Sequence, residues 1–352
     1  SLDAVGFTDV SAIEVSTALT TTIINANDQT VNLTAANTAL LDVAGDGAVG
    51  SSVTVNVSAD QATSVGGIVV NGVESSTINF TSDVETVNVG LTVEGDAAIT
   101  VAGDITFDAI AVTNAADTVT ITGTGDVTVT TTDAETIDAS GLTGALIVVA
   151  TTGGENTIAG ATGDNDVTVH DADTSYTGQG GSDTLTVAAA FSSNLGAEMG
   201  AGDDTLELSG VLSGILAVDF GSGTDTLVLG TNADVDGELL TVAGLEAIEL
   251  ADGNTTSDFD AATLSGQSFT ISPDDTDEVD DAVGIEVIVA TTDTTVDLGS
   301  LTLTNVDTVV IDASANTAAT TITGTTTDDT ITCLLNTSDA ADEAESVKPG
   351  RE

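Results

Sequence analysis

The chain has 352 residues, and its 57 acidic residues against two basic ones give a formal charge of −55 at pH 7. The basic residues, Lys348 and Arg351, stand near the C-terminal end, so salt bridges cannot hold the fold together and cations from solution must neutralise it. The same imbalance excludes nucleic acid as a partner, because phosphate contacts need a basic surface, and it argues against direct membrane insertion or attraction to anionic lipid.

The sequence cannot form an internal disulfide and contains no predicted membrane span or signal peptide. Its single cysteine, Cys333, allows no internal disulfide. No run of about 18 apolar residues predicts a membrane span, and no apolar signal-peptide core opens the sequence, which is consistent with type I secretion. A secreted β protein without disulfides needs another staple, and we expect calcium to supply it.

Despite its charge, the chain is predicted to be folded and all-β. Hydrophobic residues make up 41% of the sequence and alternate with polar ones in Val/Ile/Thr-rich runs, whereas aromatic residues make up only 2%, which fits a narrow aliphatic core. Residues 1–80 form an expected N-terminal β-rich segment. Residues 81–159 are predicted to be a β-solenoid, with strand runs such as DTVTITGTGDVTVTTTD at 117–133.

Four Gly-rich turns recur between residues 160 and 230. They are GATGDNDV at 160–167, GQGGSDTL at 178–185, MGAGDDTL at 199–206 and FGSGTDTL at 220–227. Their last polar positions are Asn165, Asp183, Asp204 and Asp225, which lie 18, 21 and 21 residues apart. A fixed period near 20 with strand residues at fixed offsets predicts a parallel β-solenoid, of the β-helix or β-roll kind, in which each repeat is one coil.

The composition of these turns points to calcium. Glycine allows the backbone to turn its carbonyl groups inward, and the following Asp adds carboxylate oxygens. An all-oxygen cage suits Ca²⁺ better than Mg²⁺ or Zn²⁺. Glu198 and Asp219, also 21 residues apart, would form a second carboxylate row that repels the first unless cations lie between them. The alternative is a calcium-free solenoid that uses Gly-Asp only for tight turns.

The turns resemble the calcium-binding RTX nonapeptide, Gly-Gly-x-Gly-x-Asp-x-apolar-x, of proteins exported by type I secretion. MGAGDDTLEL and FGSGTDTLVL match well, GQGGSDTLTV has Gln179 at one glycine position, and GTTTDDTIT at 324–332 lacks the inner glycines. The resemblance implies an RTX-like calcium-binding β-roll over residues 160–230. The implied calcium-binding residues are Asn165, Gly178, Gly181, Asp183, Glu198, Gly200, Gly202, Asp204, Asp219, Gly221, Gly223, Asp225 and Asp329.

A second resemblance covers residues 80–332. Strands of the VETVNV type, followed by ASGLTGAL and an apolar strand that leads into a Gly-Asp repeat, look like those of calcium-dependent bacterial surface-layer (S-layer) proteins. The resemblance implies a secreted, extracellular subunit that self-assembles into a lattice on the cell surface and needs calcium to fold and to assemble. The expected partners are further copies of the chain, calcium ions and a cell-surface polysaccharide.

Beyond these turns, residues 231–332 are predicted to continue the solenoid, with an exposed acidic loop at 272–283. Residues 333–352 lose the strand alternation and form an expected C-terminal tail. No catalytic motif occurs, and the lone His170 is expected to be a surface residue, so an enzyme is not expected. The alternatives are a stalk segment of an RTX adhesin, an ice-binding solenoid with Thr-rich faces, or a subunit of an extracellular filament.

Overall fold

The computed structural model of the chain describes most of its residues. They are residues 2–4, 12–16, 21–24, 26–34, 40–58, 67–81, 88–113, 117–150, 156–170, 172–188, 191–210, 213–230, 235, 240–251, 257–273 and 283–333. Most of the acidic loop (274–282) and nearly all of the predicted tail (334–352) lie outside these residues.

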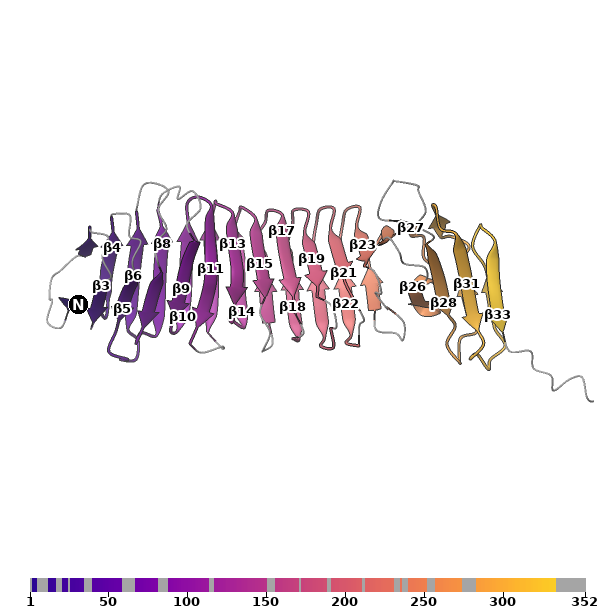
Figure 1. Cartoon of the computed structure of the whole chain (residues 1–352), viewed down its shortest axis with the longest axis horizontal. Coiled ribbons are helices and arrows are strands. Elements are labelled where there is room, and N and C mark those ends of the chain that lie inside the picture. The colour runs from indigo at the N-terminus through magenta and orange to yellow at the C-terminus, as the bar shows by residue number, and fades with distance from the viewer. Residues whose placement is uncertain are drawn as a thin grey trace, which may run out of the picture.

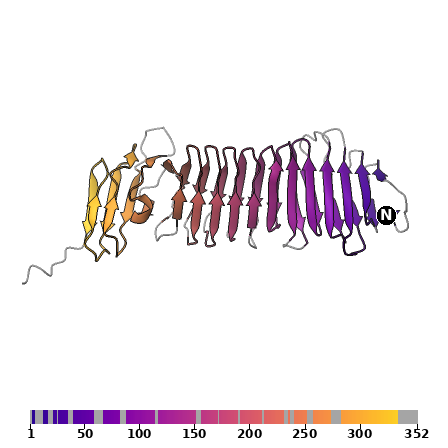
Figure 2. The same ribbon diagram turned by 180° about the vertical axis from the view of Figure 1, so that it is seen from behind.

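The fold is the predicted all-β parallel β-solenoid. The chain winds between two sheets, placing one strand in each per coil, and the coils stack into a rod (Figure 1). In the two long sheets, each strand after the first pairs in parallel with the strand one coil before it. The view from behind shows the same ladder (Figure 2). A run of parallel neighbours joined by crossovers is what the period near 20 predicts.

We call the two long sheets A and B. Sheet A has 15 strands. They are β1 (Leu2–Asp3), β3 (Thr21–Ile24), β5 (Leu41–Ala44), β7 (Ile68–Asn71), β9 (Asn88–Val93), β11 (Ile105–Val112), β13 (Val127–Thr132), β15 (Leu146–Ala150), β17 (Asn165–Val169), β19 (Thr184–Val187), β21 (Thr205–Leu208), β23 (Thr226–Leu229), β25 (Ala247–Leu250), β27 (Thr270–Pro273) and β30 (Thr302–Leu303).

Sheet B has 12 strands and stops earlier along the rod. They are β2 (Ile13–Val15), β4 (Gln29–Leu33), β6 (Ser52–Val57), β8 (Ser75–Phe80), β10 (Asp96–Val101), β12 (Thr118–Gly123), β14 (Thr136–Leu142), β16 (Asn156–Ala159), β18 (Thr174–Thr177), β20 (Leu195–Glu198), β22 (Leu216–Asp219) and β24 (Leu240–Ala243).

The core lies between the two sheets and follows from the period-two alternation. In β21 Leu206 and Leu208 are buried, whereas Thr205 and Glu207 face outward. Parallel register then places like residues above one another. One such row in sheet A is Val167, Leu185, Leu206, Leu227, Ile248 and Ile271. Aliphatic rows of this kind fill a narrow core without large rings, as the composition suggests.

The architecture changes after β25, at the orange-to-yellow end of the rod (Figure 1). Sheet B ends at β24, and the short helix α1 (Ala261–Leu264) packs against that strand. Two further sheets accompany the end of sheet A. One contains β26 (Ser257–Asp260), β28 (Gly284–Ile288), β31 (Thr308–Ala313) and β33 (Asp329–Cys333), and the other contains β29 (Thr295–Asp297) and β32 (Thr321–Thr323).

The structure changes within residues 253–283, where the strand pattern of the sequence is also interrupted. Sheet A runs without a break past positions 80, 159 and 230, where the sequence pattern suggested segment boundaries. The change falls instead near residue 257, where the four-stranded sheet begins. Among the described residues, no helix is long and apolar enough to cross a membrane.

Candidate functional site

A row of buried polar side chains lines one edge of the rod, where each coil passes from sheet B to sheet A. The row consists of Asn165, Asp183, Asp204 and Asp225, whose exposed fractions are 2%, 1%, 1% and 0%. Each lies at or directly before the first residue of a sheet A strand and points inward, so the predicted Gly-Asp corners return on the same side of every coil. We call it the inner row.

Backbone hydrogen bonds link this row from coil to coil. The amide nitrogen of Asp183 donates to Asp204 Oδ1, and that of Asp204 donates to Asp225 Oδ1, both at 2.8 Å. The amide of Asp225 donates in turn to Glu246 Oε2 at 2.9 Å. Each carboxylate therefore accepts from the preceding coil. Glu246, an exposed side chain, continues these hydrogen bonds by one coil beyond the predicted turns.

Two buried carboxylate oxygens in the row lack a partner. Asp204 Oδ2 and Asp225 Oδ2 are buried and accept no hydrogen bond. A buried charge without a partner is strongly destabilising. These two oxygens therefore keep their capacity to accept a hydrogen bond or to bind a cation.

The electrostatics of the row point the same way. Burial raises the pKa of Asp183 from 3.8 to about 7, against the lowering effect of hydrogen bonds from Asn165 and Tyr176. Burial also raises the pKa values of Asp204 and Asp225, and the neighbouring charges of Asp225 and Glu246, respectively, add to the rise. The row thus holds protons more tightly than exposed carboxylates do, unless a metal ion replaces them.

Asp183, the first carboxylate of the row, has hydrogen-bond donors on both of its oxygens. Asn165 donates to Asp183 Oδ1 from both its backbone nitrogen and its side-chain nitrogen, at 2.8 Å each. Tyr176, which is 1% exposed, donates its hydroxyl to Asp183 Oδ2 at 3.1 Å. Neutral donors therefore occupy both oxygens of Asp183, so Asn165 and Tyr176 close the row at its N-terminal end.

Backbone carbonyl groups crowd the same corners because several glycines take positive φ. Gly200, Gly202 and Gly221 have φ of 114°, 141° and 88°. A Cβ added at Gly202 would lie 1.9 Å from Gly181 O, and one at Gly221 would lie 2.0 Å from Gly200 O. The glycines are required here because each corner packs directly against the carbonyl oxygens of the corner before it.

Gln179, which replaces a glycine of the repeat, and Gly178, one of the predicted residues, take unexpected positions in the corners. Gln179 adopts φ of 78° where the following coils have glycine, and its side-chain nitrogen donates to Gly160 O at 2.6 Å. Gly178 follows β18 as Met199 follows β20, and is buried. It is glycine because a Cβ there would lie 2.0 Å from Asp183 Oδ2. Gly178 thus makes room for the contact between Tyr176 and Asp183.

The remaining predicted ligands lie apart from the inner row. Glu198 and Asp219 pair directly in register on the outer, exposed face of sheet B, so they face solvent and not the corner core. Asp329 is held within its own turn, since Thr325 donates to it from its backbone nitrogen at 2.9 Å and from its hydroxyl at 2.7 Å. The predicted second row therefore stands on the outer face of sheet B, while the inner row points into the core.

Exposed carboxylates at the corners make a complementary set of contacts. Asp203 Oδ1 accepts from Thr224 N, and Asp164 Oδ1 accepts from Ser182 N, both at 2.8 Å. Asp104 Oδ1 accepts from Asp126 N at 2.9 Å in the same sense. These exposed side chains accept from the following coil, opposite to the inner row. Because the part of the chain that the structure describes contains no Lys or Arg, backbone N–H groups are the main partners of these acidic side chains.

No protein-family model, curated protein or solved structure matches the chain. The residues themselves therefore carry the argument on function.

The chemistry of the corners fits a hard cation. The unpartnered Asp204 and Asp225 oxygens and the corner carbonyl groups are all oxygen donors, which is the set that Ca²⁺ prefers. Among the described residues, no group of three or more His, Cys, Asp or Glu side chains forms a metal cluster. A cation in the corners would consequently draw on carbonyl oxygens as well as carboxylates.

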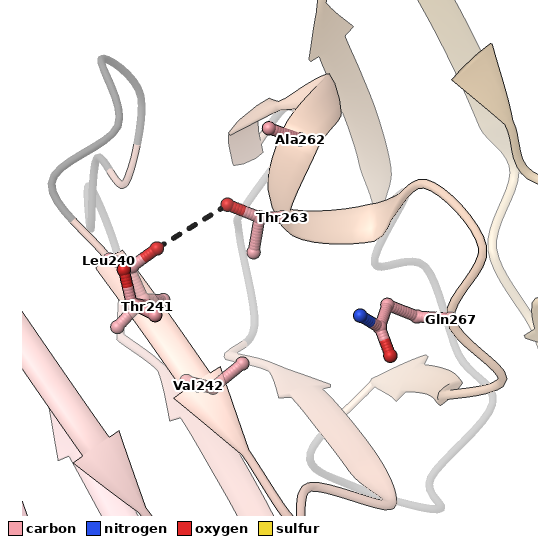
Figure 3. Close-up of a pocket in the computed structure, with 6 residues that line it drawn as sticks. All are labelled: Leu240, Thr241, Val242, Ala262, Thr263 and Gln267. Carbon is pink, nitrogen blue, oxygen red and sulfur yellow. Dashed lines mark hydrogen bonds between the residues drawn. The ribbon is translucent and has the colours of Figure 1, made fainter. Parts of the chain in front are cut away.

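A hollow of a different kind lies where sheet B ends (Figure 3). It has a volume of about 300 Å³ and lies between β24 and α1, where the Thr263 hydroxyl donates to Leu240 O at 3.5 Å. Its lining contains Leu240, Thr241, Val242, Ala262, Thr263 and Gln267. These side chains are apolar, hydroxyl or amide groups, so the lining brings no acid, base or thiol to the hollow.

Proposed function

We propose that the chain is a structural subunit of an extracellular, calcium-dependent, self-assembling array of the S-layer kind. The single observation that carries the calcium part is the pair of buried, unpartnered oxygens of Asp204 and Asp225. Calcium bound at these corners would neutralise the inner row and join successive coils. Gly200, Gly202, Gly221 and their carbonyl neighbours would complete the oxygen shell.

The rest of the molecule supports a structural role. The rod is long, regular and parallel throughout its two main sheets, and its length grows by adding coils and not by adding domains. Calcium outside cells would stabilise the folded chain, whereas low calcium inside would keep it open during export. The alternatives, an adhesin or ice-binding stalk segment and a filament subunit, share the rod but predict monomers or fibres instead of sheets.

Chelation tests this proposal directly. We expect EDTA to lower the melting temperature, measured by circular dichroism, because the inner row then loses its counter-ions. Each site contributes about 2.7 kcal/mol when calcium is a hundredfold above its Kd. Negative-stain microscopy of the same samples should show sheets with calcium and separate rods after chelation.

Magnesium at equal concentration is the control, because its small octahedral shell suits these corners less well. Equal melting temperatures in calcium and EDTA would contradict the proposal that the chain binds calcium. Fibres or lone rods in calcium would replace the array with one of the alternatives.

A further inference from the structure

One broad area of sheet B is nearly free of charge in this strongly acidic chain. It is the outward face of β4, β6, β8, β10 and β12, which we call the neutral face. Its side chains are Thr30, Asn32, Ser52, Thr54, Asn56, Ser75, Thr77, Asn79, Asp96, Ala98, Thr100, Thr118, Thr120 and Thr122. Asp96 is the single carboxylate among them, and its Oδ1 accepts from Thr118 N at 2.9 Å.

The outward face of sheet A differs. Carboxylates recur along it, on β5, β11, β17, β21 and β25. They are Asp42, Asp108, Asp166, Glu207 and Glu249. The later part of sheet B also carries Asp138, Glu198 and Asp219. Charge is therefore distributed unevenly, and the neutral face occupies the N-terminal half of one side of the rod.

The register turns the neutral face into straight rows. Thr30, Thr54 and Thr77 are aligned across three strands, and Thr120 joins them beyond Ala98. The amides of Asn32, Asn56 and Asn79 form a neighbouring ladder. Asn56 donates to Asn32 and Asn79 donates to Asn56, both at 2.8 Å. Asn56 both donates and accepts in the ladder, whereas Asn32 accepts in it and donates to Glu14 Oε1 at 2.9 Å on the neighbouring strand. Each amide group therefore keeps further hydrogen-bonding capacity.

We propose that the neutral face is the docking surface for a second copy of this chain. The inference rests on the self-assembling function proposed above and names the surface through which assembly occurs. Two rods with a formal charge of −55 repel across most surfaces, but two neutral faces bring only one carboxylate from each copy, Asp96, into the contact. Aligned rows of Thr, Ser and Asn also interdigitate well, as in-register parallel sheets do, and Asn ladders strengthen that packing.

The size of the face suits a repeated contact. Strands about 4.8 Å apart and residues about 3.3 Å long give the five-residue β4 and the four six-residue strands beside it a footprint of roughly 24 by 20 Å. Two copies would then bury on the order of 1,000 Å². That value stands at the lower limit for a specific interface. A contact of this size is weak for a single pair, and in an array it would act together with contacts on other faces of the rod.

Charge inserted into the face tests the proposal. The double variant Thr77→Glu with Thr120→Glu places one carboxylate on the middle strand of the face, β8, and one on its last strand, β12. The matched control, Thr128→Glu with Thr168→Glu, makes the same change at outward positions of sheet A and gives the same net charge. We expect the first variant to weaken self-association in calcium at least about tenfold by analytical ultracentrifugation, and the control to behave as the wild type.

A second measurement does not depend on how well the charged variant folds. In a Cys333→Ser background, which removes the single native thiol, Thr77→Cys and Thr128→Cys are treated with a short bis-maleimide. We expect covalent dimers from Thr77→Cys and monomers from Thr128→Cys. Equal cross-linking, or equal association of the two Glu variants, overturns the inference while leaving self-assembly intact.

Other outcomes separate this inference from the broader function. A wild-type chain that stays monomeric in calcium overturns both the self-docking and the array. Binding of a neutral polysaccharide such as dextran by that monomer would likewise assign the face to another partner and overturn the inference. Association through the neutral face that persists in EDTA supports the docking surface but contradicts its dependence on calcium.

Discussion

At the scale of the residue, a carboxylate in this chain is stabilised by backbone N–H groups. Asp183, Asp204 and Asp225 accept from backbone amides while nearly fully buried. Their neighbours Asp164 and Asp203 do so while exposed. Two neighbouring acidic residues, such as Asp203 and Asp204, therefore have different roles, because only the second carries a buried oxygen without a partner.

That contrast gives a prediction with a built-in control. Asp204→Asn keeps an oxygen for Asp183 N but removes the buried charge, so we expect the chelated protein to melt at a higher temperature than the wild type. With calcium, the same variant should lose about 2.7 kcal/mol per site at a hundredfold excess over Kd. Asp203→Asn makes the same charge change at the surface. If both variants respond equally to calcium in calorimetry, the inner row is not the binding site.

The sequence predicted most of the inner row, since its members recur with the period of the coil. Glu246 follows the same spacing, 21 residues after Asp225, but the Gly-rich turn that marks the other members is missing there. Tyr176 left a fainter sign. Gly178 stands where the next two coils have the large side chains of Met199 and Phe220, and that gap is what admits the tyrosine. The small side chain at this one repeat position was the sequence signal for the buried tyrosine.

At the scale of the element, the corner sets the strictest geometry. Gly202 has φ of 141° and packs its Cα against Gly181 O, so an added methyl group meets strain and a clash together. We predict that Gly202→Ala lowers the free energy of unfolding by well over about 1 kcal/mol. Gly196→Ala, with nothing within 4 Å of its added Cβ, should stay within about 0.5 kcal/mol of the wild type. Urea unfolding followed by circular dichroism measures both.

A large effect at Gly196 or a small one at Gly202 would contradict this account of the corners. Gln179 shows how the constraint can be met without glycine. Its φ of 78° is unfavourable for a residue with a side chain, yet its hydrogen bond to Gly160 O offsets part of the cost. A sequence pattern that allows only glycine at this position misses such a solution.

Strand alternation predicted the two-layer core but not the change near residue 257. The strands β24 and β26 are both short and alternating, and their sequences do not say which sheet each one joins. The structure separates them because α1 follows β26, where Asp260 caps the helix by accepting from Ala262 N at 2.8 Å. A helix of four residues leaves too little periodicity to be recognised in advance.

At the scale of the whole molecule, the excess of acidic groups should make the fold more stable as the pH falls, whereas acid usually destabilises proteins. The pKa of Asp183 is about 7 in the folded chain against an ordinary 3.8, so between these values the folded state binds more protons than the unfolded state. Stability must then rise as the pH falls through this window. Protonation of the exposed carboxylates also lowers the mutual repulsion of the rod.

We therefore predict that, in EDTA, the melting temperature increases from pH 7 to pH 4, as followed by circular dichroism. Asp183→Asn should flatten part of this increase, because it removes the proton-binding group. In calcium the trend should weaken or reverse, since protons then compete with the metal ion. A melting temperature in EDTA that falls steadily with acid would rule out a dominant role for the buried row.

The opposite senses of the two sets of corner contacts have a mechanical consequence. Each inner carboxylate accepts a hydrogen bond from the coil before it, whereas each exposed corner carboxylate accepts one from the coil after it. A corner with both kinds of carboxylate is thus hydrogen-bonded to the coil before it and to the coil after it. Unfolding of these coils from either end must break hydrogen bonds of both kinds. Tension applied along the axis is therefore shared among the corners that these hydrogen bonds join.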